Sequence, residues 1–198
     1  SGLQRYTGRV NANQQLFEGR VRFALNLNTS QVANDYVARE GGGGTFINTL
    51  AMDPTQPVYF NDPATGVQRF FQPGEGTATT ANPLASAIQI LDDGLTSRLL
   101  GNITADVDVL PQLTAQFNFG VDRSNGQRRG YTPIANPAGQ NNGGSASFQE
   151  RNNNTNTFQS YLRYEAGFGE SQLDVMGGYE FNDYSTTQAS ASAQGFVT

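Results

Sequence analysis

Residues 98–122 read RLLGNITADVDVLPQLTAQFNFGVD, and this stretch decides the fold. Apolar and polar residues alternate on both sides of Leu110-Pro111-Gln112. In the first half, one face would carry Leu99, Gly101, Ile103, Ala105, Val107 and Val109, and the other Arg98, Asn102, Thr104, Asp106 and Asp108. In the second half, Leu113, Ala115, Phe117, Phe119 and Val121 oppose Thr114, Gln116, Asn118 and Asp122. A period of two over about ten residues predicts two long β-strands joined in an antiparallel hairpin.

Four more runs with the same period bring the expected number of strands to about six. Two precede the hairpin, at 5–13 and 20–28, and two follow it, at 158–168 and 172–182. Their apolar positions are Tyr6, Val10 and Ala12, then Val21, Phe23, Leu25 and Leu27, then Phe158, Leu162, Tyr164, Ala166 and Phe168, and finally Leu173, Val175, Tyr179 and Phe181. The strands are therefore expected in three pairs, at about 3–28, 98–122 and 157–184.

The connections between these strands alternate between short and long. Short ones lie at 14–19, 110–112 and 167–171, and long ones at about 29–97 and 123–156. Short turns at one rim and long loops at the other are typical of outer-membrane barrels, with the turns on the periplasmic side. The sequence thus predicts an all-β fold, in which residues 1–198 form part of one antiparallel, up-and-down transmembrane β-barrel domain with extracellular loops at 29–97 and 123–156.

The arginines indicate which face of the predicted wall meets lipid. An Arg on the lipid side costs roughly 2 to 4 kcal/mol near the membrane midplane. A register slip of one residue in the first strand would turn both Arg5 and Arg9 toward lipid. The Arg-bearing face is therefore expected to line the lumen, while Tyr6, Phe168, Tyr179 and Phe181 face lipid, some of them in interfacial girdles.

The composition excludes several classes of function. The chain has no Cys and no His, and all 12 of its basic residues are Arg. Disulfides, thiolate or His-based catalysis, most zinc sites and lysine chemistry are thereby excluded, and the sequence predicts neither an enzyme, a metal site nor a cofactor. A net charge of −5 argues against nucleic-acid binding.

Three polar motifs have bland interpretations that we favour. Asp106 and Asp108 are spaced like a glycosidase carboxylate pair, but a solvated lumen wall is the simpler explanation. Asp92 and Asp93 are interpreted as solvated loop acids, and Gly41–Gly44, without a following G-K-[ST], as a flexible stretch. Arginines on the inner face could bind anionic substrate groups, although pairing with acids across the wall is the preferred interpretation.

Aromatic residues in the long connections are the predicted contacts with a substrate or a partner. Such side chains stack on sugars, pack against a protein lid, or pack on one another. The candidates are Tyr59, Phe60, Phe70, Phe71 and Tyr131.

Several short motifs follow one another along the chain. They are LQRYTGRVN at 3–11, DPTQPVY at 53–59 with NPLA at 82–85, RLLGN at 98–102 with LPQL at 110–113, and VMGGYE at 175–180. In order and spacing they resemble the barrel of SusC/RagA-type TonB-dependent transporters of Bacteroidota. The resemblance implies a barrel of about 22 strands with a plugged lumen. This chain would supply roughly strands three to eight, without the plug domain or the TonB box.

The family resemblance also implies a function. Transporters of this type import nutrients such as glycans or oligopeptides across the bacterial outer membrane, powered by the TonB complex and together with a SusD-like surface lipoprotein. Two alternatives share much of the sequence pattern: a passive outer-membrane porin, and a secreted soluble β-sandwich that acts as a binding module.

Overall fold

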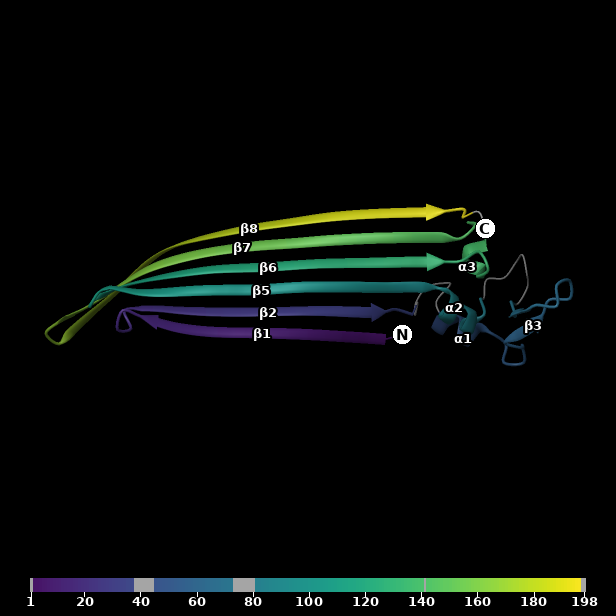
Figure 1. Ribbon diagram of the computed structural model, residues 1–198, viewed down its shortest axis with the longest axis horizontal. Helices are drawn as coiled ribbons and strands as arrows, with labels where there is room; N and C mark the ends of the chain where they lie inside the picture. Colours follow the sequence, from purple (N-terminus) through teal and green to yellow (C-terminus); the bar gives the residue numbers. More distant parts are fainter. Residues whose placement is uncertain (1, 38–44, 73–80, 141, 197–198) are drawn as a thin grey trace.

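A computed structural model describes residues 2–37, 45–72, 81–140 and 142–196. Six long strands form one antiparallel sheet in the order β1-β2-β5-β6-β7-β8. Each strand is hydrogen-bonded to its neighbours in the chain, apart from the short strands of one connection. Figure 1 shows them side by side along the length of the molecule. Their bounds are β1 Gly2–Leu16, β2 Val21–Asp35, β5 Leu91–Leu110, β6 Leu113–Thr132, β7 Ser145–Phe168 and β8 Ser171–Gln194.

The three short turns all lie at one end of the sheet, and the long connections lie at the other (Figure 1). Pro111-Gln112 joins β5 to β6, and Gly169-Glu170 joins β7 to β8. Gly169 has a φ of 60°, a left-handed conformation that glycine adopts at no steric cost. The predicted parity of turns and loops is therefore confirmed.

The strand register gives the sheet one polar face and one face with an apolar half. Near the short turns one row reads Leu25, Ile103, Phe119, Phe158 and Phe181 across five strands. Gly101 belongs to this face, because a Cβ there would lie 3.0 Å from Val121 Cγ2 and 3.3 Å from Leu27 Cδ1. We call this half the apolar band.

The apolar band is not covered by any part of the chain that the structure describes. Within the described ranges the only buried apolar residues are Ala81, Ala85 and Ala115. Ile103 in the middle of the band is 43% exposed, and Phe119 is 47% exposed. A soluble sandwich buries such a face against a second sheet, and the described residues form only one six-stranded sheet and a two-stranded hairpin, so they do not show the β-sandwich module that was the predicted alternative.

The strands are longer at the loop end than predicted. Strands β5 and β6 reach to Leu91 and Thr132, and β7 begins at Ser145, so the connections shrink to 36–90 and 133–144. Asp92 and Asp93, expected in a loop, lie in β5, and Asn152 lies in β7. The reason is physical: beyond the apolar band the outward positions of β6 are polar from Arg123 to Arg129, so the alternation that marks a strand disappears although its hydrogen bonds continue.

The long connection 36–90 carries short elements of its own, namely α1 Thr45–Ala51, β3 Tyr59–Asn61, β4 Gln68–Phe70 and α2 Pro83–Gln89. The second connection contains α3 Pro137–Gln140. Gly41–Gly44 lies outside the described residues. None of the three helices in the described ranges is long and apolar enough to cross a membrane.

Candidate functional site

Ion pairs join neighbouring strands along the polar face. Arg22 and Asp108, Arg98 and Asp122, and Arg163 and Asp174 each approach to 2.6 Å between a guanidinium nitrogen and a carboxylate oxygen. The fourth pair, Arg128 and Asp92, is also 2.6 Å apart and lies at the loop end. The prediction that inner-face arginines pair with acids across the wall is therefore confirmed for these four.

Amide side chains continue the polar face between the ion pairs. Asn102 donates to Asn118, and Asn118 Nδ2 donates to Gln159 Oε1 at 2.8 Å, which links β5, β6 and β7. Asp108 also accepts from Thr114 Oγ1 at 3.3 Å. Since Asp108 is already held by Arg22, the Asp106 and Asp108 pair does not present two free carboxylates. No three acidic side chains of the described ranges gather closely enough to hold a metal ion.

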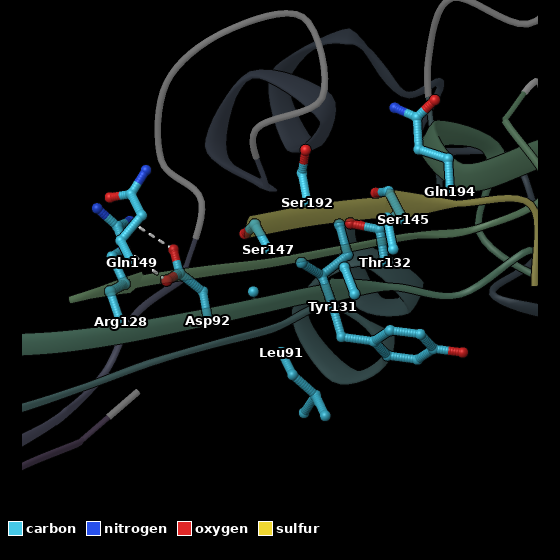
Figure 2. Close-up of a pocket in the computed structure, with 14 residues that line it drawn as sticks. Leu91, Asp92, Arg128, Tyr131, Thr132, Ser145, Ser147, Gln149, Ser192 and Gln194 are labelled. Atoms are coloured by element: carbon cyan, nitrogen blue, oxygen red, sulfur yellow. Dashed lines mark hydrogen bonds and ion pairs between the residues drawn. The ribbon is translucent and has the colours of Figure 1, made fainter. Parts of the chain in front are cut away.

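A hollow of about 430 Å³ opens near the loop end of the sheet (Figure 2). Gly130 lies directly between Asp92 and Ser147 in the register, and its missing side chain leaves room on the polar face. In Figure 2, the side chains of Leu91 and Tyr131 lie on one side of the sheet, and those of Ser192 and Gln194 lie on the other. The polar side chains of the hollow are those of Asp92, Arg128, Thr132, Ser145, Ser147, Gln149, Ser192 and Gln194.

A second hollow of about 280 Å³ adjoins the first and shares Arg128 and Gln149 with it. The Arg128 guanidinium carbon lies 4.8 Å from the centroid of the Tyr36 ring, within the range of a cation–π contact. Gly94 is needed beneath that ring, because a Cβ there would lie 2.9 Å from Tyr36 Cε2. The other residues of this hollow are Thr96, Gly126, Gln127, Glu150, Arg151 and Gln188. We call the two hollows together the polar basin.

The sequence reasoning missed the polar basin. Gly94, Gly126 and Gly130 share the polar face with Arg98 and Asp122, so extending the alternation beyond the apolar band would have placed them together. The side chains that face the basin offer hydroxyl, amide and guanidinium donors with the carboxylate of Asp92, and none of them is a nucleophile paired with a base. The carboxylate of Glu150 points to the other face, where it accepts from Asn125. Such a surface binds hydrated solutes by hydrogen bonds, with no reaction implied.

A buried asparagine organises the connection between β2 and β5. Asn82 is 1% exposed, and its Nδ2 donates to the carbonyls of Val58 at 3.0 Å and Phe71 at 2.9 Å. Its Oδ1 accepts from the N–H groups of Leu84 and Ala85, which caps the first turn of α2. One side chain thus ties the β3–β4 hairpin to the helix that leads into β5.

Four of the five predicted aromatic residues come together on this hairpin. Tyr59 and Phe70 are directly opposite, with ring centroids 4.9 Å apart, and the centroids of Phe60 and Phe71 are 6.3 Å apart with the rings at 89°. Tyr59, Phe60 and Phe70 line a groove of about 720 Å³ that also touches Gln68, Arg69, Gln72, Gln89, Ile134, Ala135 and Gln140.

The turn of the hairpin is closed by an acidic residue. Asp62 Oδ1 accepts from the Ala64 N–H at 2.9 Å, and Arg69 lies 3.3 Å from the other carboxylate oxygen. The Ala64 hydrogen bond is the largest cause that lowers the pKa of Asp62 below its usual value, and Arg69 adds to it. Arg69, the one charged residue of the groove, is therefore already paired.

Tyr131 does not join the other four aromatics. It lies in β6 rather than in a loop, on the side of the sheet away from the polar basin (Figure 2). Its ring centroid is 6.0 Å from that of Phe196, which follows β8. The two rings pack on each other at the loop end of the sheet.

No family model matches the chain. Curated relatives do. TonB-dependent receptor P3 of Formosa agariphila is 26% identical over a match 204 residues long, which covers 100% of this chain and 20% of the relative. TonB-dependent receptor SusC of Bacteroides thetaiotaomicron is 26% identical over 201 residues, covering 91% of this chain and 19% of that protein. The chain thus spans about a fifth of the length of these receptors.

Solved structures give the same fold. The RagAB peptide importer in its open-open state matches 99% of this chain with a TM-score of 0.73 and 19% identity, and its closed-closed state matches 98% with a TM-score of 0.69 and 20% identity. In both, the match covers 22% of the other chain. The relatives are receptors and importers rather than enzymes. Sequence and fold together make this chain a six-stranded segment of a transmembrane β-barrel similar to that of the SusC/RagA-type TonB-dependent receptors.

Proposed function

We propose that this chain forms part of the wall of a TonB-dependent transporter in the bacterial outer membrane. The observation that carries the proposal is the uncovered apolar band on one face, opposite ion pairs and amides on the other, with every long connection at one end. An uncovered apolar face is stable against acyl chains, and a polar face suits a water-filled or plugged lumen. The short turns then lie in the periplasm, and the loops lie outside the cell.

The transported nutrients belong to the classes that the family imports, glycans or oligopeptides. The β3–β4 hairpin and its groove lie among the extracellular loops, where Tyr59, Phe60, Phe70 and Phe71 are placed to contact a substrate or a SusD-like lipoprotein. The rings pack on one another, those of Tyr59, Phe60 and Phe70 still line the groove, and Tyr59 is 44% exposed. Tyr131 stays a prediction of such a contact, although its position on Phe196 sets it apart.

Energy coupling separates this proposal from a passive porin. Deletion of the gene for the whole receptor should abolish uptake of its nutrient, and a protonophore should abolish uptake in cells that keep the gene. Uptake that survives the protonophore would contradict TonB dependence and favour the porin.

The orientation of the sheet can be tested in intact cells, because this chain has no Cys. In the full receptor, Thr65→Cys lies in the β3–β4 turn and Glu170→Cys lies in the β7–β8 turn. A membrane-impermeant maleimide should label the first in intact cells and the second only after lysis. Labelling of Glu170→Cys in intact cells would place the short turns outside.

A further inference from the structure

Arg151 in β7 is an inner-face arginine without an acidic partner among the described residues, as are Arg5 and Arg9 in β1, and of these three it alone lines the polar basin. Its Nε donates to Asn153 Oδ1 at 3.3 Å, a weak neutral contact. The adjacent acid, Glu150, points to the other face, where its Oε1 accepts from Asn125 at 2.9 Å and from Asn152 at 3.3 Å. Within the described residues, Arg151 therefore adds a positive charge that no acid pairs.

The neighbours of Arg151 leave space around it. In the register Arg151 lies between Gly126 on β6 and Gln188 on β8, and Gln149 follows on the same face of β7. Gly126 places no side chain beside the guanidinium, and a Cβ there would meet nothing closer than Thr96 Oγ1 at 3.8 Å. These groups line the smaller hollow of the polar basin, about 280 Å³ in volume.

The nearby carboxylate of the basin does not neutralise Arg151. Both oxygens of Asp92 are occupied by Arg128, at 2.7 Å from Nε and 2.6 Å from Nη2. Arg128 in turn stacks on Tyr36. The lining of the basin therefore carries one net positive charge on this face, surrounded by carboxamide and hydroxyl groups.

We propose that the polar basin binds a carboxylate group of a solute in the lumen, with Arg151 as its charged ligand and Gln149 and Gln188 as neutral donors. A guanidinium presents two parallel N–H groups to a carboxylate, and the flanking amides satisfy its remaining lone pairs. A single unpaired guanidinium pairs with one carboxylate group of the solute. This inference rests on the proposed function, since it takes the polar face to line the route of the nutrient.

Arginine-selective modification tests the site in the whole receptor without knowledge of its nutrient. Purified receptor in detergent is treated with phenylglyoxal, and modification of each arginine is measured by peptide mass spectrometry. Arg123 is the matched internal control, because it lies on the opposite face and bonds only to neutral groups, Asn156 Oδ1 at 2.6 Å and the carbonyls of Thr155 and Asp122. Succinate is the carboxylate probe, and succinamide is its neutral counterpart.

We expect succinate to protect Arg151 in a saturable manner, succinamide to have no effect, and Arg123 to react equally with either. Gln149→Ala and Gln188→Ala should each raise the half-protecting succinate concentration by about threefold to tenfold, the value of one hydrogen bond. Equal protection by succinamide, or protection of Arg123 to the same degree, would overturn the site. So would an Arg151 that does not react even without succinate, because another part of the receptor would then occupy it.

The outcome separates this site from the proposed transport. Loss of succinate protection in a receptor that still supports energy-dependent uptake overturns only the carboxylate site. Retained protection in a receptor that supports no uptake leaves the site and contradicts the transport function.

Discussion

The two halves of the same strands differ in what lies beside them. Toward the short turns, β5 and β6 present Ile103 and Phe119 on one face and Asn102 and Asn118 on the other. Toward the loops, the outward positions of β6 become polar, beginning at Arg123. From Leu113 to Val121 the strand advances about 26 Å, or about 20 Å in height at a tilt of about 40°, which covers most of an apolar band of about 25 Å.

This difference indicates that the strands extend beyond the membrane on the loop side. Backbone pairing continues for eleven residues beyond Val121 on β6, through Asp122 to Thr132. In that half the hydrogen-bonded ladder and the polar contacts across it hold the wall together. We call this half, toward the loops, the upper half and the other the lower half. The polar basin lies in the upper half and the aromatic groove lies in the loops beyond it, so all candidate contacts lie beyond the apolar band.

The largest expected effect comes from an arginine in the apolar band. Phe117→Arg should destabilise the inserted receptor by about 2 to 4 kcal/mol, because Phe117 lies in the middle of the band. Gln127→Arg, on the same strand and face but in the upper half, should change stability by less than about 0.5 kcal/mol. Urea unfolding of the full receptor in lipid vesicles measures both. Similar losses for the two variants would show that the upper half also lies in the membrane.

The pattern of Leu, Val and Phe predicted the lower half and its pairing well, because lipid imposes a sharp alternation there. It made the strands too short at their loop ends. There Asn152, Asn154 and Asn156 face outward, in a region where no apolar partner is required. The sequence predicted that arginines pair with acids across the wall, but it did not predict which acid pairs with which arginine. Arg98 reaches Asp122 diagonally, and a diagonal contact depends on rotamers that no sequence pattern specifies.

Of the candidate site, the sequence analysis named four aromatic residues that the fold brings together on one hairpin, and it missed what gathers them. Tyr59 and Phe70 are eleven residues apart, and a hairpin between them has weak local signals. Asn82 fixes it by bonding two carbonyls that are thirteen residues apart in the chain, Val58 and Phe71. A hydrogen-bond bridge of this kind depends on the tertiary structure, so no periodic pattern in the sequence predicts it.

The second prediction separates the loops from the wall. Asn82→Ala removes the cap of α2 and two donors to buried carbonyls, so it should lower the local free energy of opening by about 2 kcal/mol. Hydrogen exchange should accelerate in 58–71 and 81–89 and stay unchanged in β5 and β6. Asn82→Asp, which keeps the capping oxygen but cannot donate to the carbonyls, distinguishes the two roles. Faster exchange along β5 in either variant would mean that the loop supports the wall.

The third prediction compares two adjacent glycines of β8 on opposite faces. A Cβ on Gly178 would lie 2.4 Å from Tyr161 Cδ1 and 3.0 Å from the Ser160 carbonyl oxygen, whereas a Cβ on Gly177 meets nothing within 4 Å. Gly178→Ala should therefore cost about 1 to 3 kcal/mol through overpacking. Gly177→Ala should be neutral or stabilising by about 0.5 kcal/mol. Thermal unfolding of the receptor in detergent measures both, and equal effects would contradict the close packing of Tyr161 on the inner face.

The smallest expected change in stability concerns the ion pairs. It tests whether the inner face is exposed to water. The side chains of Arg98 and Asp122 are 55% and 30% exposed, so water and salt screen their attraction although the contact is bidentate. A double-mutant cycle of Arg98→Gln and Asp122→Asn should give a coupling of about 0.5 kcal/mol that shrinks in high salt. Removing one partner of a dry pair instead costs about 3 to 5 kcal/mol, because the remaining charge is stranded away from water. A penalty of that size for either single variant would mean that the inner face near Arg98 is sealed from solvent. The proposed contrast between a lipid-facing side and a solvent-exposed side would then not hold at this position.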